Sequence, residues 1–177
     1  MAIYVKLPTV PPTINVDGVD QLDWSKPSVA GKVKEMREFY QVPLSQVLGD
    51  EDGVGGGCID LLHCKGFMGG RKPFPMPRNA KIKQNYYNLR AQCCYKLTEY
   101  VNARKISIPI QSQEVRDQAI AELEQIKAKS IDQDDKPLQI VGKDEIKERI
   151  GRSPDLADNF MMRMFFEISS RPSITWL

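Results

Sequence analysis

The sequence predicts an α/β fold with a central mixed sheet flanked by helices. Segments with helical periodicity alternate with short strand-like segments over residues 28–168, and glycines follow the apolar run at 44–48 as they do at a strand-to-helix turn. With 177 residues, of which 41% are hydrophobic, the chain can bury one core of ordinary domain size. We therefore expect one domain over 28–177, preceded by a poorly defined segment over 1–27.

The signals in the first half are short and are separated by prolines and glycines. Residues 1–27 are rich in proline and aspartate and give only isolated strand signals. Ser28 is the predicted N-cap of the first helix, and Pro43 ends that helix. The expected elements are strands near 3–6 and 14–16, a helix at 28–40, a buried strand at 44–48 and a helix at 58–63.

Longer amphipathic helices dominate the second half. Residues 66–82 contain several prolines and glycines and predict a flexible loop. Ser153 is the predicted N-cap of the last helix, and Pro154 is its first residue. The elements expected after the loop are helices at 85–102, 112–129, 143–150 and 154–168, with strands at 105–110 and 136–141. The helix at 112–129 is expected to bury Val115, Ala119, Leu123 and Ile126 and to expose its charged residues.

Acidic residues stand where predicted elements end or begin. Asp50 is the first of three consecutive acids after the 44–48 strand, while Asp155 and Asp158 share one face at the start of the last helix. Carboxylate oxygens are the ligands that Mg²⁺ and Mn²⁺ prefer, and two such ions can clamp a phosphodiester during hydrolysis. The pattern predicts a divalent-metal site made of Asp50, Asp155 and Asp158. Acids that only form turns or favour a helix dipole explain the same pattern, and this alternative stays open.

Basic residues gather in the middle of the chain. No acid occurs between Asp60 and Glu99, a span that contains eight lysines and arginines. Such an uncompensated segment predicts a surface that meets phosphates, with a solvated loop as the alternative. The residues predicted to contact DNA are Lys65, Arg71, Lys72, Arg78, Lys81 and Lys83.

Spacing and composition disfavour several other classes of protein. The four cysteines form no C-x-x-C pair, so we interpret them as core residues in a reducing compartment. Neither glycine-rich stretch contains the G-x-x-x-x-G-K-[ST] pattern of a P-loop. The sequence shows no apolar run of about 18–20 residues, the length needed to cross a bilayer. We expect a soluble, cytoplasmic protein with no membrane partner.

Four short motifs occur in a characteristic order. They are DEDGVGGG at 50–57, NLRAQ at 88–92, KDEIKER at 143–149 and GRSPDLAD at 151–158. This order resembles the C-terminal nuclease domain of tailed-phage terminase large subunits, over residues 28–168. The resemblance implies a ribonuclease H-like fold and Mg²⁺- or Mn²⁺-dependent endonucleolytic cleavage of viral DNA during packaging.

The resemblance also implies site residues and partners. Asp50 matches the family's second metal-binding carboxylate and Asp155 its last one, with Asp158 as a weaker candidate. The family's first carboxylate stands on the opening strand of a β-hairpin, which residues 1–27 do not show, and Asp17 is the nearest substitute. We therefore expect a chain truncated at its N-terminus, such as a split-gene product or prophage remnant, with an incomplete two-ion site and weak or lost activity. The implied partners are double-stranded DNA, the terminase ATPase domain, the small terminase subunit and the portal.

Two functions of other classes stay open. In a non-catalytic DNA-binding or packaging-machine docking module, the acids would serve only as caps and turn residues. A host regulatory protein of unrelated fold is the third alternative. Metal titration separates a nuclease from a docking module, because a ligand stabilises only a protein that binds it in the folded state.

Overall fold

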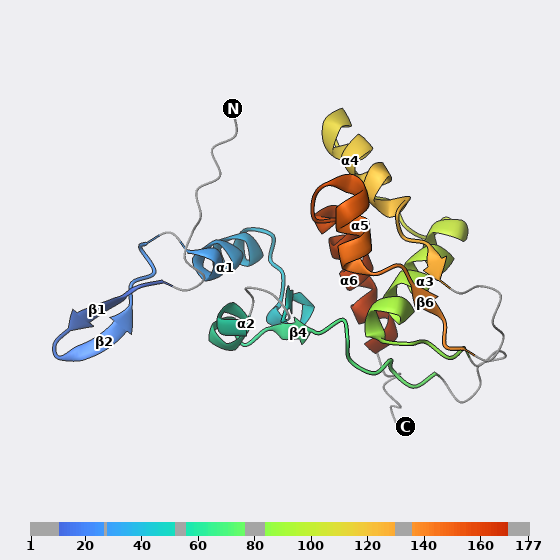
Figure 1. The fold of residues 1–177 in the computed structure, drawn as a ribbon. Coiled ribbons are helices and arrows are strands. Elements are labelled where there is room, and N and C mark those ends of the chain that lie inside the picture. The colour runs from blue at the N-terminus through green and yellow to red at the C-terminus, as the bar shows by residue number, and fades with distance from the viewer. Residues whose placement is uncertain (1–10, 27, 52–55, 77–83, 130–135, 170–177) are drawn as a thin grey trace, which may run out of the picture. The chain divides into compact units, whose positions relative to one another are not determined.

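The computed structural model describes residues 11–26, 28–51, 56–76, 84–129 and 136–169. The chain divides into two compact units, one ending at Met68 and the other beginning at Gly69 (Figure 1). Helices and short strands occur in both units, so the predicted mixed α/β class is confirmed. Among the described helices, none is both long and apolar enough to span a membrane.

The first unit contains a hairpin and a small assembly of helices and strands. Its core is formed by Ala30, Cys58 and Leu62, where α1 and α2 pack together. Ser28 caps α1 as predicted, because its hydroxyl accepts a hydrogen bond from the Gly31 N–H at 3.0 Å. The elements are β1 (Thr13–Val16), β2 (Val19–Leu22), α1 (Val29–Phe39), η1 (Leu44–Gln46), β3 (Leu48–Asp50), α2 (Gly56–Leu62) and β4 (Lys65–Phe67).

The hairpin of β1 and β2 corrects a prediction. The strands pair antiparallel from Thr13 opposite Leu22 to Val16 opposite Val19. The turn residues Asp17 and Gly18 have φ of 53° and 80°, and an Asp-Gly pair suits this turn because both positions need positive φ. The expectation that residues 1–27 show no hairpin is therefore wrong for 13–22, whereas the strand expected at 3–6 lies outside the described residues.

The segment around Asp50 forms a strand–helix–strand motif. β3 and β4 pair in parallel, with Asp50 opposite Phe67, and α2 connects them. The strand begins at Leu48, later than predicted, because 44–46 forms a 3₁₀ turn. A Cβ at Gly49 would lie 2.9 Å from Ile59 Cγ1, so α2 can approach β3 this closely only where the strand carries glycine.

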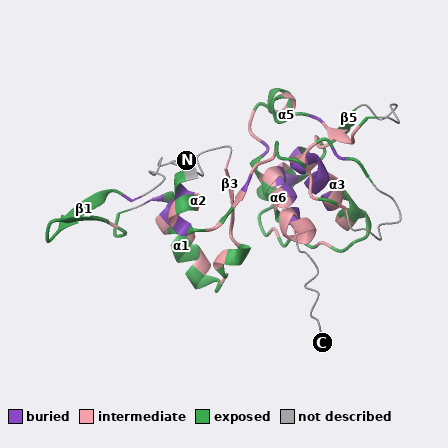
Figure 2. Ribbon diagram, turned by 90° about the horizontal axis from the view of Figure 1, so that it is seen from below, coloured by how far each residue is buried: buried purple, intermediate pink, exposed green. Residues whose placement is uncertain are grey.

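The second unit is built around α3 and α6, which pack against each other, and their buried residues are visible in Figure 2. Cys93 and Cys94 of α3 are buried, which agrees with their interpretation as core residues. Burial raises the pKa of both thiols to about 12, so they are unreactive at neutral pH. The elements are α3 (Leu89–Asn102), α4 (Gln113–Leu123), β5 (Ala128–Lys129), β6 (Gln139–Ile140), α5 (Lys143–Ile150) and α6 (Asp155–Ser169).

The strands differ from the predicted central sheet. In the described part of the chain they form three two-stranded sheets, of which β3–β4 is parallel and the other two are antiparallel. Residues 105–110 form no strand and are mostly exposed, because alternation alone does not supply a pairing partner. The strand expected at 136–141 is confirmed over Gln139–Ile140, and α4 ends at Leu123, short of 129, because Ala128–Lys129 pair with that strand.

Candidate metal centre and nucleic-acid interface

Asp50 lies at the C-terminal end of β3, as the sequence predicts. It is half-buried, and the next residue, Glu51, donates its backbone N–H to the Phe67 carbonyl at 2.8 Å. The Glu51 side chain lies against Gly66, since a Cβ there would come within 2.6 Å of Glu51 Oε2. Two carboxylates therefore follow a parallel strand pair, while Asp52 lies outside the described residues.

Asp155 is the first residue of α6, and its side chain is exposed. Among the described residues, its carboxylate makes neither a hydrogen bond nor an ion pair. Asp158, one turn further on, is partly buried, and its Oδ2 lies 2.7 Å from Lys143 Nζ at the start of α5. Asp155 is thus available to a ligand, whereas Asp158 is already neutralised by a lysine.

The predicted metal ligands fall in different compact units. Asp50 belongs to the first unit, and Asp155 and Asp158 belong to the second. No group of three or more His, Cys, Asp or Glu side chains able to hold a metal ion is found within the described residues. The joint site of Asp50 and Asp155 therefore stays a prediction.

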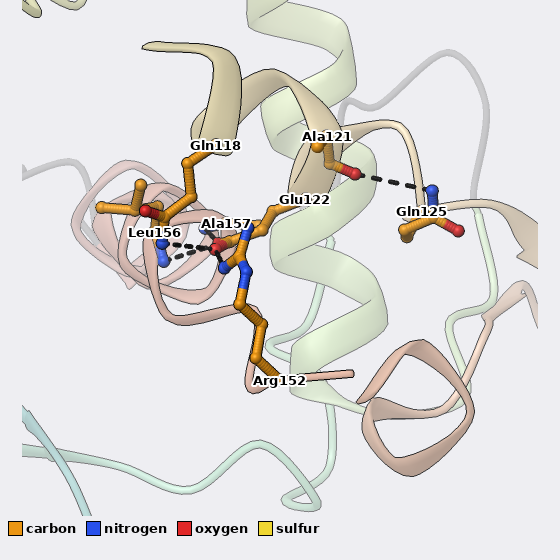
Figure 3. Close-up of polar contacts among 7 residues, drawn as sticks. All are labelled: Gln118, Ala121, Glu122, Gln125, Arg152, Leu156 and Ala157. Carbon is orange, nitrogen blue, oxygen red and sulfur yellow. Dashed lines mark hydrogen bonds and ion pairs between the residues drawn. The ribbon is translucent and has the colours of Figure 1, made fainter. Parts of the chain in front are cut away.

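The N-terminus of α6 is capped by a glutamate from another helix. Glu122 of α4 is fully buried, and its Oε2 accepts hydrogen bonds from the N–H groups of Leu156 at 2.8 Å and Ala157 at 3.0 Å (Figure 3). Its Oε1 pairs with the Arg152 guanidinium and accepts a hydrogen bond from Gln118 Nε2 at 3.1 Å. This one carboxylate ties together α4, α6 and the segment that joins α5 to α6.

The cap differs from the predicted one. The Pro154 carbonyl accepts the hydrogen bond from the Asp158 N–H, so Pro154 holds the N-cap position that was expected for Ser153. Proline has no side-chain acceptor for the next N–H groups, and Glu122 takes that role. Glu122 was not predicted as a cap because all charged residues of this helix were expected on its exposed face. The spacing of Glu122 from Ala119 on one face of α4 is the signal that could have revealed it.

Burial and hydrogen bonding act in opposite directions on the pKa of Glu122. Burial by itself raises that pKa, but the N–H of Ala157 and the side chains of Arg152 and Gln118 all favour the ionised form. The net effect is a pKa below the ordinary value of 4.5. Glu122 is therefore ionised at neutral pH despite its burial.

Acidification should destabilise the second unit through Glu122. Because the folded-state pKa lies below the unfolded value of 4.5, ionised Glu122 adds stability above that pH. The unfolded chain takes up its proton first, so this contribution is lost as the pH falls from 4.5 through the folded-state pKa. We expect the free energy of unfolding, measured with urea, to fall more steeply with acid in the wild type than in Glu122→Gln. Identical pH profiles for the two proteins would contradict this assignment.

Two of the solved structures that resemble this chain come from one bacterial virus. Both show the nuclease domain of the large terminase subunit gp2 of bacterial virus Sf6, one of them as a lysine-to-alanine mutant with manganese and beta-thujaplicinol. Their sequence identities to this chain are 24% and 23%, and each match covers 76% of this chain and 70% of the other, with a TM-score of 0.56. The chain has the fold of a phage terminase nuclease domain. No family model matches the sequence, and no curated protein does so either.

The terminase fold confirms, at the level of the fold, the resemblance drawn from the four motifs. The structure gives one of these motifs, NLRAQ, a packing role. Asn88 caps α3 by accepting the Ala91 N–H at 2.8 Å, and Leu89 and Ala91 are buried. Arg90 Nη1 donates to the Val141 carbonyl at 2.9 Å. The motif therefore helps to hold the second unit together, and Arg90 contributes a hydrogen bond to the backbone of Val141.

The basic residues predicted to contact DNA belong to both compact units. Lys65 lies on β4 of the first unit, and Arg71 and Lys72 lie in the second unit, all three exposed. Lys96, also in the basic span, pairs with Glu99 on its own helix at 2.9 Å. The candidates Arg78, Lys81 and Lys83 lie outside the described residues.

The described part of the predicted flexible loop is anchored. Gln92, buried on α3, accepts the Phe74 N–H at 2.8 Å and donates its amide to the Phe74 carbonyl at 3.0 Å. The carbonyls of Gly69 and Arg71 accept the N–H groups of the first two helical positions of α3, at 3.0 and 2.8 Å. Arg71 and Lys72 are therefore carried on a turn that is fixed to the helix at both ends.

Proposed function

We propose that this chain is a metal-dependent DNA endonuclease domain of the terminase type. The observation that carries the proposal is the exposed Asp155 carboxylate at the start of α6, without a partner among the described residues, in a chain with this fold. Asp50 at the end of a parallel strand supplies a second acid of the kind expected. Manganese in one of the Sf6 structures supports a divalent ion as the cofactor.

Carboxylate side chains are the kind of ligand that suits Mg²⁺ or Mn²⁺. Asp50 and Asp155 would hold the ions, and Asp158 would contribute less because Lys143 already neutralises it. A donor set made of oxygen alone suits these hard cations. Such ions lower the pKa of water and neutralise the charge that develops on a phosphodiester. The partners under this proposal are duplex DNA, the terminase ATPase domain, the small subunit and the portal.

Manganese dependence tests the proposal. Mn²⁺ should stabilise the 177-residue protein against thermal unfolding, by about 2.7 kcal/mol at a hundredfold excess over the dissociation constant. Because Asp155 supplies a ligand, Asp155→Asn should remove most of this stabilisation. Nicking of supercoiled plasmid in Mn²⁺ should be slow, since the first carboxylate of the family is not evident, and should disappear in Asp50→Ala.

Matched controls give this test its meaning. Asp144 is an exposed acid in the first turn of α5, as Asp155 is in α6, and Asp144→Asn should keep the full Mn²⁺ effect. Asp60 is exposed on α2, and Asp60→Ala should keep the nicking activity that Asp50→Ala removes. A protein that is indifferent to Mn²⁺, or nicking that persists in Asp50→Ala, contradicts the proposal. Indifference to Mn²⁺ together with retained DNA binding would favour the docking module.

Arg71 and Lys72 should contribute sequence-independent affinity for duplex DNA. Each phosphate contact adds about one unit to the slope of log affinity against log salt. The double variant Arg71→Gln/Lys72→Gln should therefore bind more weakly, with a slope reduced by about two units, in fluorescence anisotropy titrations over a range of salt concentrations. Lys105→Gln/Lys127→Gln removes two exposed charges elsewhere and is the control. Equal slopes in the two double variants would exclude Arg71 and Lys72 from the DNA surface.

A further inference from the structure

The first turn of α6 presents an arrangement of donors and acids that is unusual for a helix start. The first four backbone N–H groups of a helix have no partner within the helix, and nearby side chains or water satisfy them. Asp155 is the first residue of α6 and could accept hydrogen bonds there, yet its carboxylate makes no hydrogen bond or ion pair with the described residues. The N–H groups of Leu156 and Ala157 are instead taken by Glu122, which reaches them from α4 (Figure 3).

Glu122 is held in place on its other side as well. Its Oε1 pairs with Arg152 and accepts a hydrogen bond from Gln118, one turn earlier on α4. No part of the Glu122 side chain is exposed, so solvent cannot replace it as the cap. The N–H groups of Leu156 and Ala157 are therefore capped from α4 and not by an acid of α6 itself.

We propose that Glu122 is a positioning residue for Asp155, an inference that rests on the metal-dependent function proposed above. By occupying the N–H groups of Leu156 and Ala157, Glu122 prevents the Asp155 carboxylate from folding back onto its own helix. It also fixes the backbone from which Asp155 projects. Mutation of a residue that holds a metal ligand in position without touching the metal typically lowers metal affinity by about 10–100-fold.

The test measures Mn²⁺ binding by the whole chain instead of its activity. Thermal unfolding of the 177-residue protein over a Mn²⁺ titration gives the concentration for half-maximal stabilisation. Glu122→Gln should raise that concentration about tenfold or more. Leu97→Ala removes a buried side chain from α3, which destabilises the same unit without touching the cap, and should leave the half-maximal concentration unchanged. This control separates positioning from a general loss of stability.

A double variant tests the route through Asp155. Because Glu122 is proposed to act on Asp155, Glu122→Gln should have no further effect on Mn²⁺ binding in an Asp155→Asn background. Arg152→Gln leaves both hydrogen bonds of the cap in place. It should therefore lower the free energy of unfolding and leave the Mn²⁺ concentration for half-maximal stabilisation unchanged. Should Glu122→Gln fail to fold, Glu122→Asp keeps the charge, withdraws it by one methylene group and should raise the Mn²⁺ requirement in the same direction.

The outcomes distinguish this inference from the proposed function. If Mn²⁺ stabilises the wild type and Glu122→Gln or Glu122→Asp binds it as well as the wild type does, the positioning role is overturned and the nuclease proposal stands. A similar rise in the Mn²⁺ requirement in Leu97→Ala would also overturn it. If Mn²⁺ does not stabilise the wild type at all, the proposed function fails, and the inference fails with it.

Discussion

Glu122→Ala should destabilise the second unit by about 2–4 kcal/mol, because it leaves buried groups without partners. The N–H groups of Leu156 and Ala157 lose their acceptor, and the bond to Ala157 is buried while that to Leu156 is partly buried. Arg152 adds less to the loss, because its side chain is 39% exposed and can be solvated once the glutamate is gone. Native-state hydrogen exchange of the α3 amides measures the stability of this unit separately from the first one.

Glu124 provides the control for this substitution. It lies two residues further along the chain, at the C-cap of α4, and its side chain is exposed. Glu124→Ala removes a carboxylate of the same size and should change stability by no more than about 0.5 kcal/mol. Equal effects of Glu122→Ala and Glu124→Ala on α3 exchange would show that the buried cap contributes nothing of its own.

Local signals in the sequence located most helices of this fold. Ser28 is the N-cap of α1, as expected, and α5 has the predicted bounds 143–150. Ser112, expected as the first residue of its helix, is the N-cap of α4. Asn88 caps α3, so that this helix begins at Leu89, four residues after the predicted start at 85. Such features depend on residues three or four apart, and these are the distances over which caps and helical periodicity act.

Contacts between distant residues explain what the sequence did not reveal. Glu122 meets Leu156 and Ala157 across 34 and 35 residues, and its charge placed it on the expected exposed face of the helix. The proline- and glycine-rich loop was expected to be flexible from its composition. The hydrogen bonds between Phe74 and Gln92 that anchor it join residues 18 apart, so local signals do not reveal them. Of the candidate site residues, Asp50 and Asp155 could be placed at element ends because a strand end and a helix start are local features.

The buried amide of Gln92 supports the second large prediction. Gln92→Leu keeps the side-chain volume but removes both hydrogen bonds to the backbone of Phe74. The Phe74 N–H and C=O are partly buried, so we expect a loss of about 1–3 kcal/mol in the local stability of residues 69–76. Hydrogen exchange of the Phe74 amide measures this loss directly, and its protection should fall by about 5- to 150-fold.

The effect of Gln92→Leu should extend to DNA binding if Arg71 and Lys72 meet the phosphates. These residues lie on the turn that Gln92 anchors, and a loosened turn loses more conformational entropy when DNA orders it again. Affinity should fall while the salt dependence keeps its slope, because no charge has been removed. Gln125→Leu is the control, since among the described residues the Gln125 amide donates only to the Ala121 carbonyl, four residues earlier on α4, at 3.5 Å. A changed salt slope in Gln92→Leu would mean that the substitution displaces a charged contact and does not merely loosen the turn.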